Sequence, residues 1–396
     1  MKVPCWLAMS ALVMVGCGGE DADGSADADG SAGEVEVDGG GEVSGEDGVG
    51  DSGGGEDGGG EDEGEGVELV GGVGHGTRIW GEGSAAVVLE VWYPTAELGG
   101  AAELWSFEEG ARQELVRGWI EGEGGECVSR GLGQVRGAEP LRGEWDVVVF
   151  SHCYGCARWS SASVALALVR EGYVVVGVEH GGTTMWDREG GTLEPLDDLT
   201  LEGRIVEVRG VMDEVGEIVG EYVREGWQPR MIAWGHSMGV GTMVGAVAGR
   251  GDVLGVVAHA APLENPLFSP RLEDVRVPVL MLLAGEDNSI LEVGNRFMRM
   301  NFEGLGEGVR GWLVEVGDAG HWSFSDVPGL VEELAPGCGD AVRQTNGEPF
   351  SYLGAEVGRR LAAEWTVFFV NEVSGRSVGE PEEGSGVLVV RRGPGE

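Results

Sequence analysis

Apolar and polar positions alternate in blocks along most of the chain after Val67. Two short runs, DVVVFS at 146–151 and YVVVGVE at 173–179, are continuously apolar, which is typical of strands buried on both faces of a parallel sheet. Between them, residues 160–171 have helical spacing and are followed by Gly172, and glycine commonly ends helices. These three segments predict a β-α-β unit.

The same alternation continues toward the C-terminus. We expect further strands at 86–93, 231–235, 253–258, 277–284 and 311–316, and further helices at 202–225, 238–249, 290–301 and 357–370. Strands that alternate with helices over this length predict an α/β fold with a mostly parallel central sheet flanked by helices. We assign this domain to residues 67–375 and regard 376–396 as a C-terminal tail.

The first 17 residues have the proportions of a signal peptide, with a basic start at Lys2 and an apolar run too short to span a bilayer. Their end, MVGC at 14–17, resembles the bacterial lipobox, although Met14 stands where that motif usually has Leu. The resemblance implies export and a lipid anchor on Cys17, in the bacterial outer membrane or at the cell surface. Ordinary signal cleavage, giving a periplasmic or secreted protein, and an unprocessed leader are the alternatives.

Residues 18–66 differ in composition from the rest, with 18 Asp and Glu, 19 Gly and no Lys or Arg. Such a segment buries too little apolar surface to offset its ordering entropy, so we predict a disordered acidic Gly-rich tether. Its two Asp-Ala-Asp-Gly sequences, at 21–24 and 27–30, resemble half of a calcium loop. The remaining ligands are not in register, so a solvated linker is the preferred interpretation and no metal site is expected.

Charge and lysine content exclude several classes of function. The whole chain carries a formal charge of −43, whereas nucleic-acid binding needs a positive patch, so we expect no nucleic-acid partner. The one lysine is Lys2, which excludes Schiff-base chemistry and a P-loop lysine from the folded domain.

The motif GHSMG at 235–239 lies between an expected strand and an expected helix. This is the context of a nucleophile elbow, in which the serine sits on a sharp turn and the glycines avoid collisions. Gly-x-Ser-x-Gly also occurs by chance in a glycine-rich chain. With a strand before it and a helix after it, the motif favours Ser237 as a nucleophile.

A serine nucleophile needs a histidine base that a carboxylate orients. Of the six histidines, we select His321 because it follows the last expected strand of the domain, where the order Ser, Asp, His places the base. The other five are His75, His152, His180, His236 and His259. Asp287 follows the strand at 277–284 and is the expected acid, with Glu286 in reserve; Asp318 is assigned to loop structure.

Between about residues 86 and 370 the chain resembles the bacterial α/β-hydrolases that include platelet-activating-factor acetylhydrolase-like, dienelactone-hydrolase-like and cutinase-like polyester hydrolases. The motifs that carry the resemblance are VWYP at 91–94, FSH at 150–152, Arg158, GYVV at 172–175, EH at 179–180, GHSMG at 235–239, VPVL at 277–280, Asp287 and GHWSF at 320–324. The resemblance implies a monomeric serine carboxylic-ester hydrolase that acts through an acyl-enzyme on a small or lipid-like ester, without a cofactor. Polyester hydrolysis and acyl transfer are alternatives; a catalytically silent surface-binding protein on the same scaffold is an alternative of another class.

The family places one oxyanion amide after the nucleophile and the other in the loop after an earlier strand. These positions correspond to Met238 and Tyr154. The family usually reads His-Gly-x-Gly-Gly in that loop, whereas this chain has HCYGC at 152–156. We take Trp159, Leu263 and Trp322 as candidate pocket residues, although cutinase-like enzymes often carry an aromatic residue where this chain has Leu263.

Four cysteines remain after the leader: Cys127, Cys153, Cys156 and Cys338. An even number in an exported protein favours disulfides, and of three connectivities we prefer Cys153–Cys156 with Cys127–Cys338. A redox Cys-x-x-Cys is the functional alternative for the first pair. No haem-attachment motif or zinc-ligand spacing is present.

Overall fold

A computed structural model describes residues 71–83, 86–122, 127–265, 270–335, 337–377 and 379–393. The expected leader with Cys17 and the expected tether at 18–66 lie outside the described residues. No helix in the described ranges is long and apolar enough to cross a membrane.

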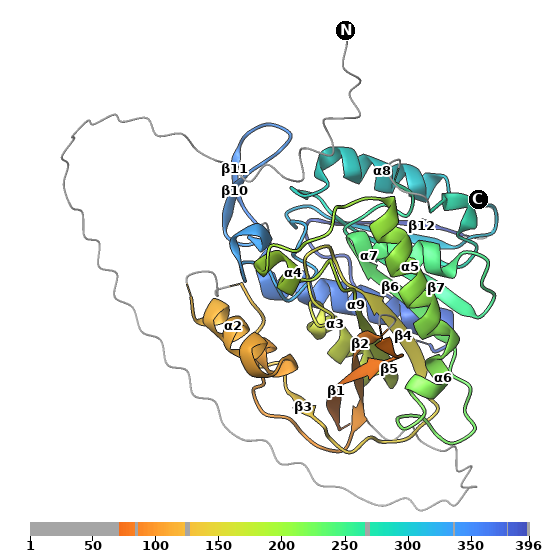
Figure 1. Ribbon diagram of the computed structural model, residues 1–396. Coiled ribbons are helices and arrows are strands. Elements are labelled where there is room, and N and C mark those ends of the chain that lie inside the picture. The colour runs from red at the N-terminus through yellow and green to blue at the C-terminus, as the bar shows by residue number, and fades with distance from the viewer. Residues whose placement is uncertain are drawn as a thin grey trace, which may run out of the picture. The chain divides into compact units, whose positions relative to one another are not determined.

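The centre of the domain is a ten-stranded sheet (Figure 1) with the strand order β12-β9-β8-β7-β6-β4-β5-β2-β1-β3. Its strands are β1 (Gly72–Trp80), β2 (Val87–Thr95), β3 (Gln134–Arg136), β4 (Asp146–Ser151), β5 (Tyr173–Glu179), β6 (Met231–His236), β7 (Val253–His259), β8 (Val279–Ala284), β9 (Gly311–Val316) and β12 (Val387–Arg392). The strands from β4 to β9 run parallel, and β2 and β12 pair antiparallel at the two sides of this block. All carboxyl ends of the parallel strands therefore meet at one edge, where ligands bind in α/β sheets.

Helices cover both faces of the sheet (Figure 1). One hydrophobic cluster joins the sheet to α2, α3 and α9, and a second joins it to α5, α6, α7 and α8. The helices are α2 (Gly110–Glu121), α3 (Ala162–Arg170), α4 (Met185–Glu189), α5 (Asp198–Asp213), α6 (Val215–Ile218), α7 (Met238–Val247), α8 (Leu291–Glu303) and α9 (Ala355–Ser374), with 3-10 turns η3 (Leu104–Phe107), η4 (Leu272–Asp274) and η5 (Glu332–Leu334). A separate hairpin joins β10 (Asp340–Val342) to β11 (Pro349–Ser351).

The central strands are buried on both faces because their side chains alternate between the two helical layers. Every residue of β4, β5, β6 and β8 is buried. The predicted α/β fold with a mostly parallel sheet flanked by helices is thus confirmed in the described residues, and the strands at 146–151 and 173–179 have the predicted limits.

Two predicted boundaries were wrong. The helix expected at 202–225 begins at Asp198 and ends at Asp213, and only the four-residue α6 follows it. Three glycines, at 210, 216 and 220, lower helix propensity over this stretch by about 1 kcal/mol each. The expected C-terminal tail at 376–396 is not outside the domain, because β12 within it pairs with β9 over six residues and buries Val389.

The strand β1 was not predicted, because glycines at alternate positions hide its pattern. A Cβ on Gly74 would lie 2.3 Å from the Tyr93 ring on the paired strand. The ring therefore takes the space that a side chain would need, and only glycine fits at this position.

Candidate active site

Ser237 lies on the sharp turn between β6 and α7. Its backbone has φ 56° and ψ −123°, a strained conformation for a residue with a side chain. The turn is tight on both sides: a Cβ on Gly235 would lie 2.3 Å from the carbonyl oxygen of Gly239, and a Cβ on Gly239 would lie 2.0 Å from that of Ser151. Glycines are therefore required at both positions, and Ser237 stands at the carboxyl edge of the sheet.

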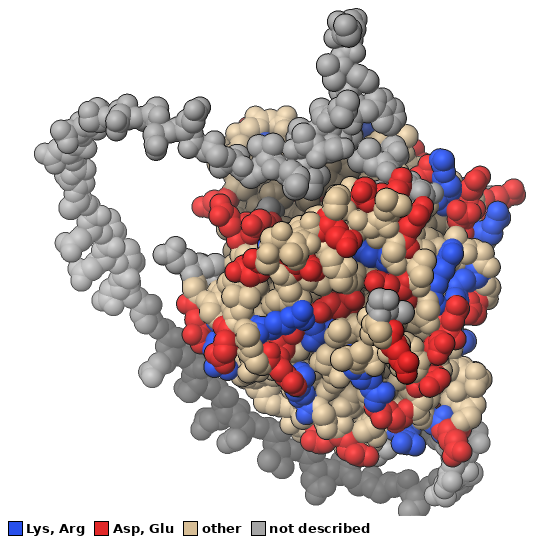
Figure 2. Space-filling view, viewed as in Figure 1, with Lys and Arg blue, Asp and Glu red and all other residues tan. Residues whose placement is uncertain are grey.

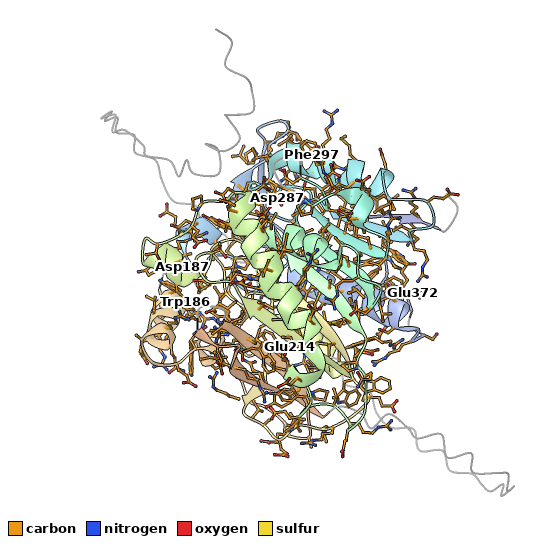
Figure 3. All side chains as sticks on the ribbon, turned by 45° about the vertical axis from the view of Figure 1, so that its right-hand side comes forward. Trp186, Asp187, Glu214, Asp287, Phe297 and Glu372 are labelled. Atoms are coloured by element: carbon orange, nitrogen blue, oxygen red, sulfur yellow. A yellow bond between two sulfur atoms is a disulfide. The ribbon has the colours of Figure 1, made fainter. Side chains whose placement is uncertain are left out.

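The structure brings Ser237, His321 and Asp287 together from the ends of three strands. His321 Nε2 lies 2.8 Å from Ser237 Oγ, and His321 Nδ1 lies 2.7 Å from Asp287 Oδ2. His321 and Asp287 are fully buried, while Ser237 is partly exposed. Asp287 lies beside the start of α8 (Figure 3), where its Oδ1 accepts the amides of Ser289 and Ile290 at 2.9 Å each. Both oxygens of the carboxylate are thus occupied, which fixes the plane of the carboxylate against the imidazole.

The neighbouring acids have other partners. Glu286, the reserve candidate, accepts Arg343 Nη1 at 2.9 Å and the Gln344 amide at 3.1 Å. Asp318 accepts the same guanidinium at 2.8 Å. The geometry therefore assigns the carboxylate at His321 to Asp287.

The other five histidines are buried and hydrogen-bonded elsewhere. The Nε2 of His236 lies 3.0 Å from the His321 carbonyl oxygen, and burial holds the pKa of His236 well below its ordinary value. His75 contacts Glu90, and His259 lies between Trp234 and Thr366 with its pKa lowered by burial to about 3. The remaining two, His152 and His180, contact each other beside the loop after β4.

That loop, residues 152–156, is called the oxyanion loop below. Its Cys153–Cys156 disulfide is present, as is Cys127–Cys338, so both predicted pairings are confirmed. The Tyr154 phenol donates to the Glu194 carbonyl oxygen, while the amides of Tyr154 and Met238 donate to no acceptor in the described part of the chain. Both amides are therefore available to a ligand.

The three expected pocket residues are all buried. Trp159 was misplaced by the sequence prediction: it is fully buried, stacks on Phe107 and donates to Glu108 Oε1 at 2.7 Å, so it belongs to the core. Leu263 is 1% exposed. Trp322 is 6% exposed and packs edge-on against the His321 ring. The two ring centroids lie 4.4 Å apart, so Trp322 restricts the movement of the imidazole.

Two nearby features were not predicted. Tyr352 lies close to Asp287. Burial is the main cause that raises the pKa of Tyr352 to about 12, and the charges of Asp287 and Glu286 add to it.

A hollow of about 120 Å³ beside the oxyanion loop is lined by Trp119, Met185, Arg188, Glu189, Leu330, Val331 and Glu333. The Arg188 side chain donates to the Tyr154 carbonyl oxygen at 3.4 Å, which links this hollow to the loop.

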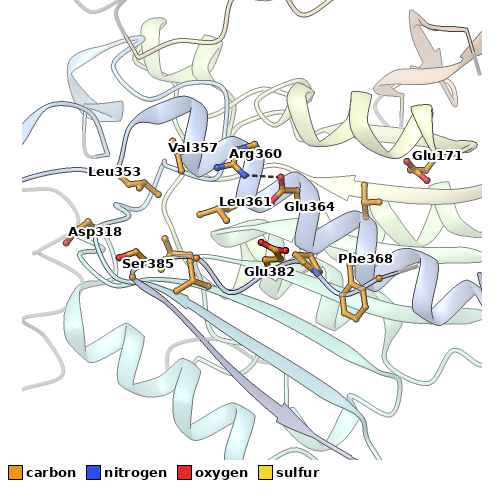
Figure 4. A pocket seen from close by; sticks show the side chains of 17 residues that line it. Glu171, Asp318, Leu353, Val357, Arg360, Leu361, Glu364, Phe368, Glu382 and Ser385 are labelled. Atoms are coloured by element: carbon orange, nitrogen blue, oxygen red, sulfur yellow. Dashed lines mark hydrogen bonds and ion pairs between the residues drawn. The ribbon is translucent and has the colours of Figure 1, made fainter. Parts of the chain in front are cut away.

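A larger surface groove, of about 780 Å³, lies between α9 and the segment that leads into β12 (Figure 4). It is lined by Leu353, Val357, Leu361 and Phe368 among others, and neither Ser237 nor His321 borders it. The groove is thus separate from the candidate active site. No group of three or more His, Cys, Asp or Glu side chains in the described ranges could hold a metal ion.

Charges are mixed on the surface seen in Figure 2, with acidic and basic side chains interspersed and no broad basic patch on that face. Many of the arginines are paired with carboxylates, as Arg299 is with Glu315 at 2.7 Å.

No family model and no curated protein matches the chain. Among solved structures, it is similar to a ferulic acid esterase from Streptomyces cinnamoneus, with a TM-score of 0.58 and 17% identity over 81% of this chain and 96% of that one. The likeness spans almost the whole of that enzyme, so the chain shares the fold of this esterase.

Proposed function

We propose that the protein is a serine carboxylic-ester hydrolase. The observation that carries the proposal is the hydrogen-bonded chain from Ser237 Oγ through His321 to Asp287, at 2.8 and 2.7 Å, on a strained turn. The fold shared with a ferulic acid esterase supports it. A catalytically silent binding protein would not need to keep this geometry.

In the proposed reaction, Ser237 Oγ attacks the ester carbonyl carbon while His321 Nε2 takes its proton. Asp287 holds the Nδ1–H tautomer of His321 and stabilises the imidazolium. The amides of Met238 and Tyr154 stabilise the oxyanion, each worth about 3 kcal/mol of the barrier. The alcohol leaves with the proton from His321, and water then hydrolyses the acyl-enzyme by the same steps in reverse. No cofactor takes part in the proposed reaction.

A fluorophosphonate probe tests the nucleophile directly. The wild type should become labelled, and Ser237→Ala should abolish labelling and lower p-nitrophenyl ester hydrolysis at least about 10³-fold. Ser385→Ala is the matched control, because Ser385 is exposed in the segment before β12. A folded wild type that neither reacts with the probe nor hydrolyses any ester would refute the proposal.

The substrate class needs a separate panel. We infer a small or lipid-like ester, as the resemblance of residues 86–370 to the bacterial α/β-hydrolases implies. The panel comprises p-nitrophenyl esters of increasing acyl length, a feruloyl ester, soluble polyester oligomers and a short-acyl phospholipid. Adding an alcohol acceptor and measuring new ester against free acid distinguishes acyl transfer from hydrolysis.

We further propose that the protein is exported, and that Cys17 carries its lipid anchor. Two disulfides in one domain support an oxidising compartment. Globomycin, which blocks lipoprotein signal cleavage, should cause an unprocessed precursor to accumulate, and Cys17→Ser should release the mature domain from membranes. If the wild type and the Cys17→Ser variant are processed identically, lipidation of Cys17 is contradicted.

A further inference from the structure

Arg204, on α5, is a buried cation that forms no ion pair with any carboxylate in the described ranges. Its side chain is 2% exposed, and burial lowers the pKa of the guanidinium to about 9. A buried charge costs several kcal/mol unless polar groups replace the lost water. Arg204 finds them in the His152 carbonyl oxygen, in Ser151 Oγ at 3.0 Å and in Thr183 Oγ1 at 3.4 Å. The acceptors lie where β4 passes into the oxyanion loop and in the loop after β5.

The far end of the oxyanion loop is held from the same side. The Gly155 amide donates to the Thr183 carbonyl oxygen at 2.8 Å, so the residue that Arg204 contacts also holds Gly155. The Cys153–Cys156 disulfide closes the segment between these two attachments. The loop is therefore fixed at its beginning, at its end and across its middle.

The hydrogen bonds inside the loop determine the orientation of the Tyr154 amide. His152 Nε2 accepts the His180 amide at 3.1 Å, so the proton of this neutral imidazole lies on Nδ1, which donates to the Cys153 carbonyl oxygen at 2.6 Å. In a trans peptide the N–H points opposite to the C=O. The Tyr154 N–H therefore points away from the His152 ring and is free for a ligand.

We propose that Arg204 is a positioning residue for the oxyanion loop: it holds the His152 carbonyl and the Ser151 hydroxyl so that the Tyr154 amide is presented to the developing oxyanion. This inference rests on the proposed esterase function. Arg204 acts through the backbone of the loop and does not touch the substrate.

Arg204 is linked to Glu207 through a chain of hydrogen bonds. Ser151 Oγ accepts from Arg204, so its own proton is free for His180 Nε2 at 2.9 Å, and His180 Nδ1 then donates to Glu207 Oε2 at 2.6 Å. These three hydrogen bonds run in one consistent direction, with His180 neutral because burial lowers its pKa. Although the order Ser151, His180, Glu207 resembles a second triad, Ser151 is fully buried and is not accessible as a nucleophile. The chain therefore fixes the orientation of the Ser151 hydroxyl.

Arg204→Met tests the proposal against Arg209→Met as matched control. Arg209 lies on the same helix but donates to the Gly245 carbonyl oxygen at 2.7 Å, at the far end of α7. We expect Arg204→Met to lower kcat and the rate of fluorophosphonate labelling by roughly 10- to 100-fold with little change in KM, because losing a whole oxyanion donor costs about 10²- to 10³-fold. Arg209→Met should lower Tm alone. Arg204→Lys, which keeps the charge but not the two-pronged donor, should give an intermediate kcat.

A folded Arg204→Met variant that keeps the wild-type kcat would overturn the positioning role. So would a decrease in kcat no larger than the decrease that Arg209→Met causes. Should Arg204→Met fail to fold, Arg204→Lys carries the same comparison, and wild-type kcat in that variant overturns the inference. Absence of Ser237-dependent activity in the wild type is a different result, because it refutes the proposed function itself.

Discussion

The substitution Asp287→Asn tests how the carboxylate controls the tautomer of His321. Asp287 Oδ1 accepts two amides, from Ser289 and Ile290, at 2.9 Å each. In the variant, the amide oxygen must stay at this position, because an NH2 group there would face two N–H donors. The NH2 group is then directed at His321 Nδ1, which has to accept, so the imidazole proton moves to Nε2. His321 can no longer take the proton of Ser237.

The expected loss follows from this wrong tautomer. The corresponding change in a serine protease lowers kcat about 10⁴-fold, which corresponds to about 5.5 kcal/mol of transition-state stabilisation. The assay is kcat on a p-nitrophenyl ester, with Tm measured to show that the variant folds. Asp318→Asn is the control, because Asp318 is half-exposed and pairs with Arg343. A loss under tenfold in Asp287→Asn, or a larger loss in Glu286→Gln, would refute the assignment.

Three further predictions concern the scaffold. Replacing Cys127 and Cys338 by Ser opens a loop of 211 residues. The chain-entropy model then predicts that the free energy of unfolding falls by up to about 5 kcal/mol. Urea unfolding measures this free energy, and a decrease below about 1 kcal/mol would contradict the prediction. Burial raises the pKa of Glu207 to about 7, so the folded state favours the proton and loses stability as pH rises from about 4.5 to 7. Glu207→Gln removes that loss, and its Tm advantage over the wild type should grow between pH 5 and 8; a constant difference would exclude this titration. Gly239→Ala places a Cβ 2.0 Å from a backbone oxygen and should abolish fluorophosphonate labelling of Ser237. In the control Gly241→Ala, the new Cβ meets only a Leu side chain at 3.6 Å, so this variant should stay active. Equal labelling of both variants would show that the turn at Ser237 has more room than described.

The sequence predicted those parts of the fold that depend on local pattern. The strand at 146–151 is apolar throughout, and GHSMG is flanked by strand and helix, so both could be located without tertiary information. By contrast, β12 is a short run far from its partner β9 along the chain, and only the pairing distinguishes it from a tail. The end of α5 at Asp213 was missed because apolar spacing continues past glycines that weaken the helix.

The site shows the same division. Ser237, Asp287 and His321 each follow a strand, and parallel strands bring their carboxyl ends together, so order along the chain was enough to select them. Arg204 could not be found in this way, because an arginine in an amphipathic helix usually faces solvent. Trp159 was expected at the pocket because it follows the oxyanion loop in sequence, yet its ring turns into the core under η3. Adjacency along the chain does not give the direction of a side chain.

The strand order has a practical meaning for fusion proteins. β1 and β12 lie near opposite edges of the sheet, and eight spacings of about 4.8 Å separate them by roughly 38 Å. A partner joined after β12 leaves from Arg392, which pairs with Gly311 at the start of β9. A partner joined before β1 leaves from Gly72, which pairs with Thr95 at the end of β2, beside the start of β5. Both joins therefore lie at the edge of the sheet opposite Ser237, Asp287 and His321, so reporter domains at either end should leave the candidate active site open.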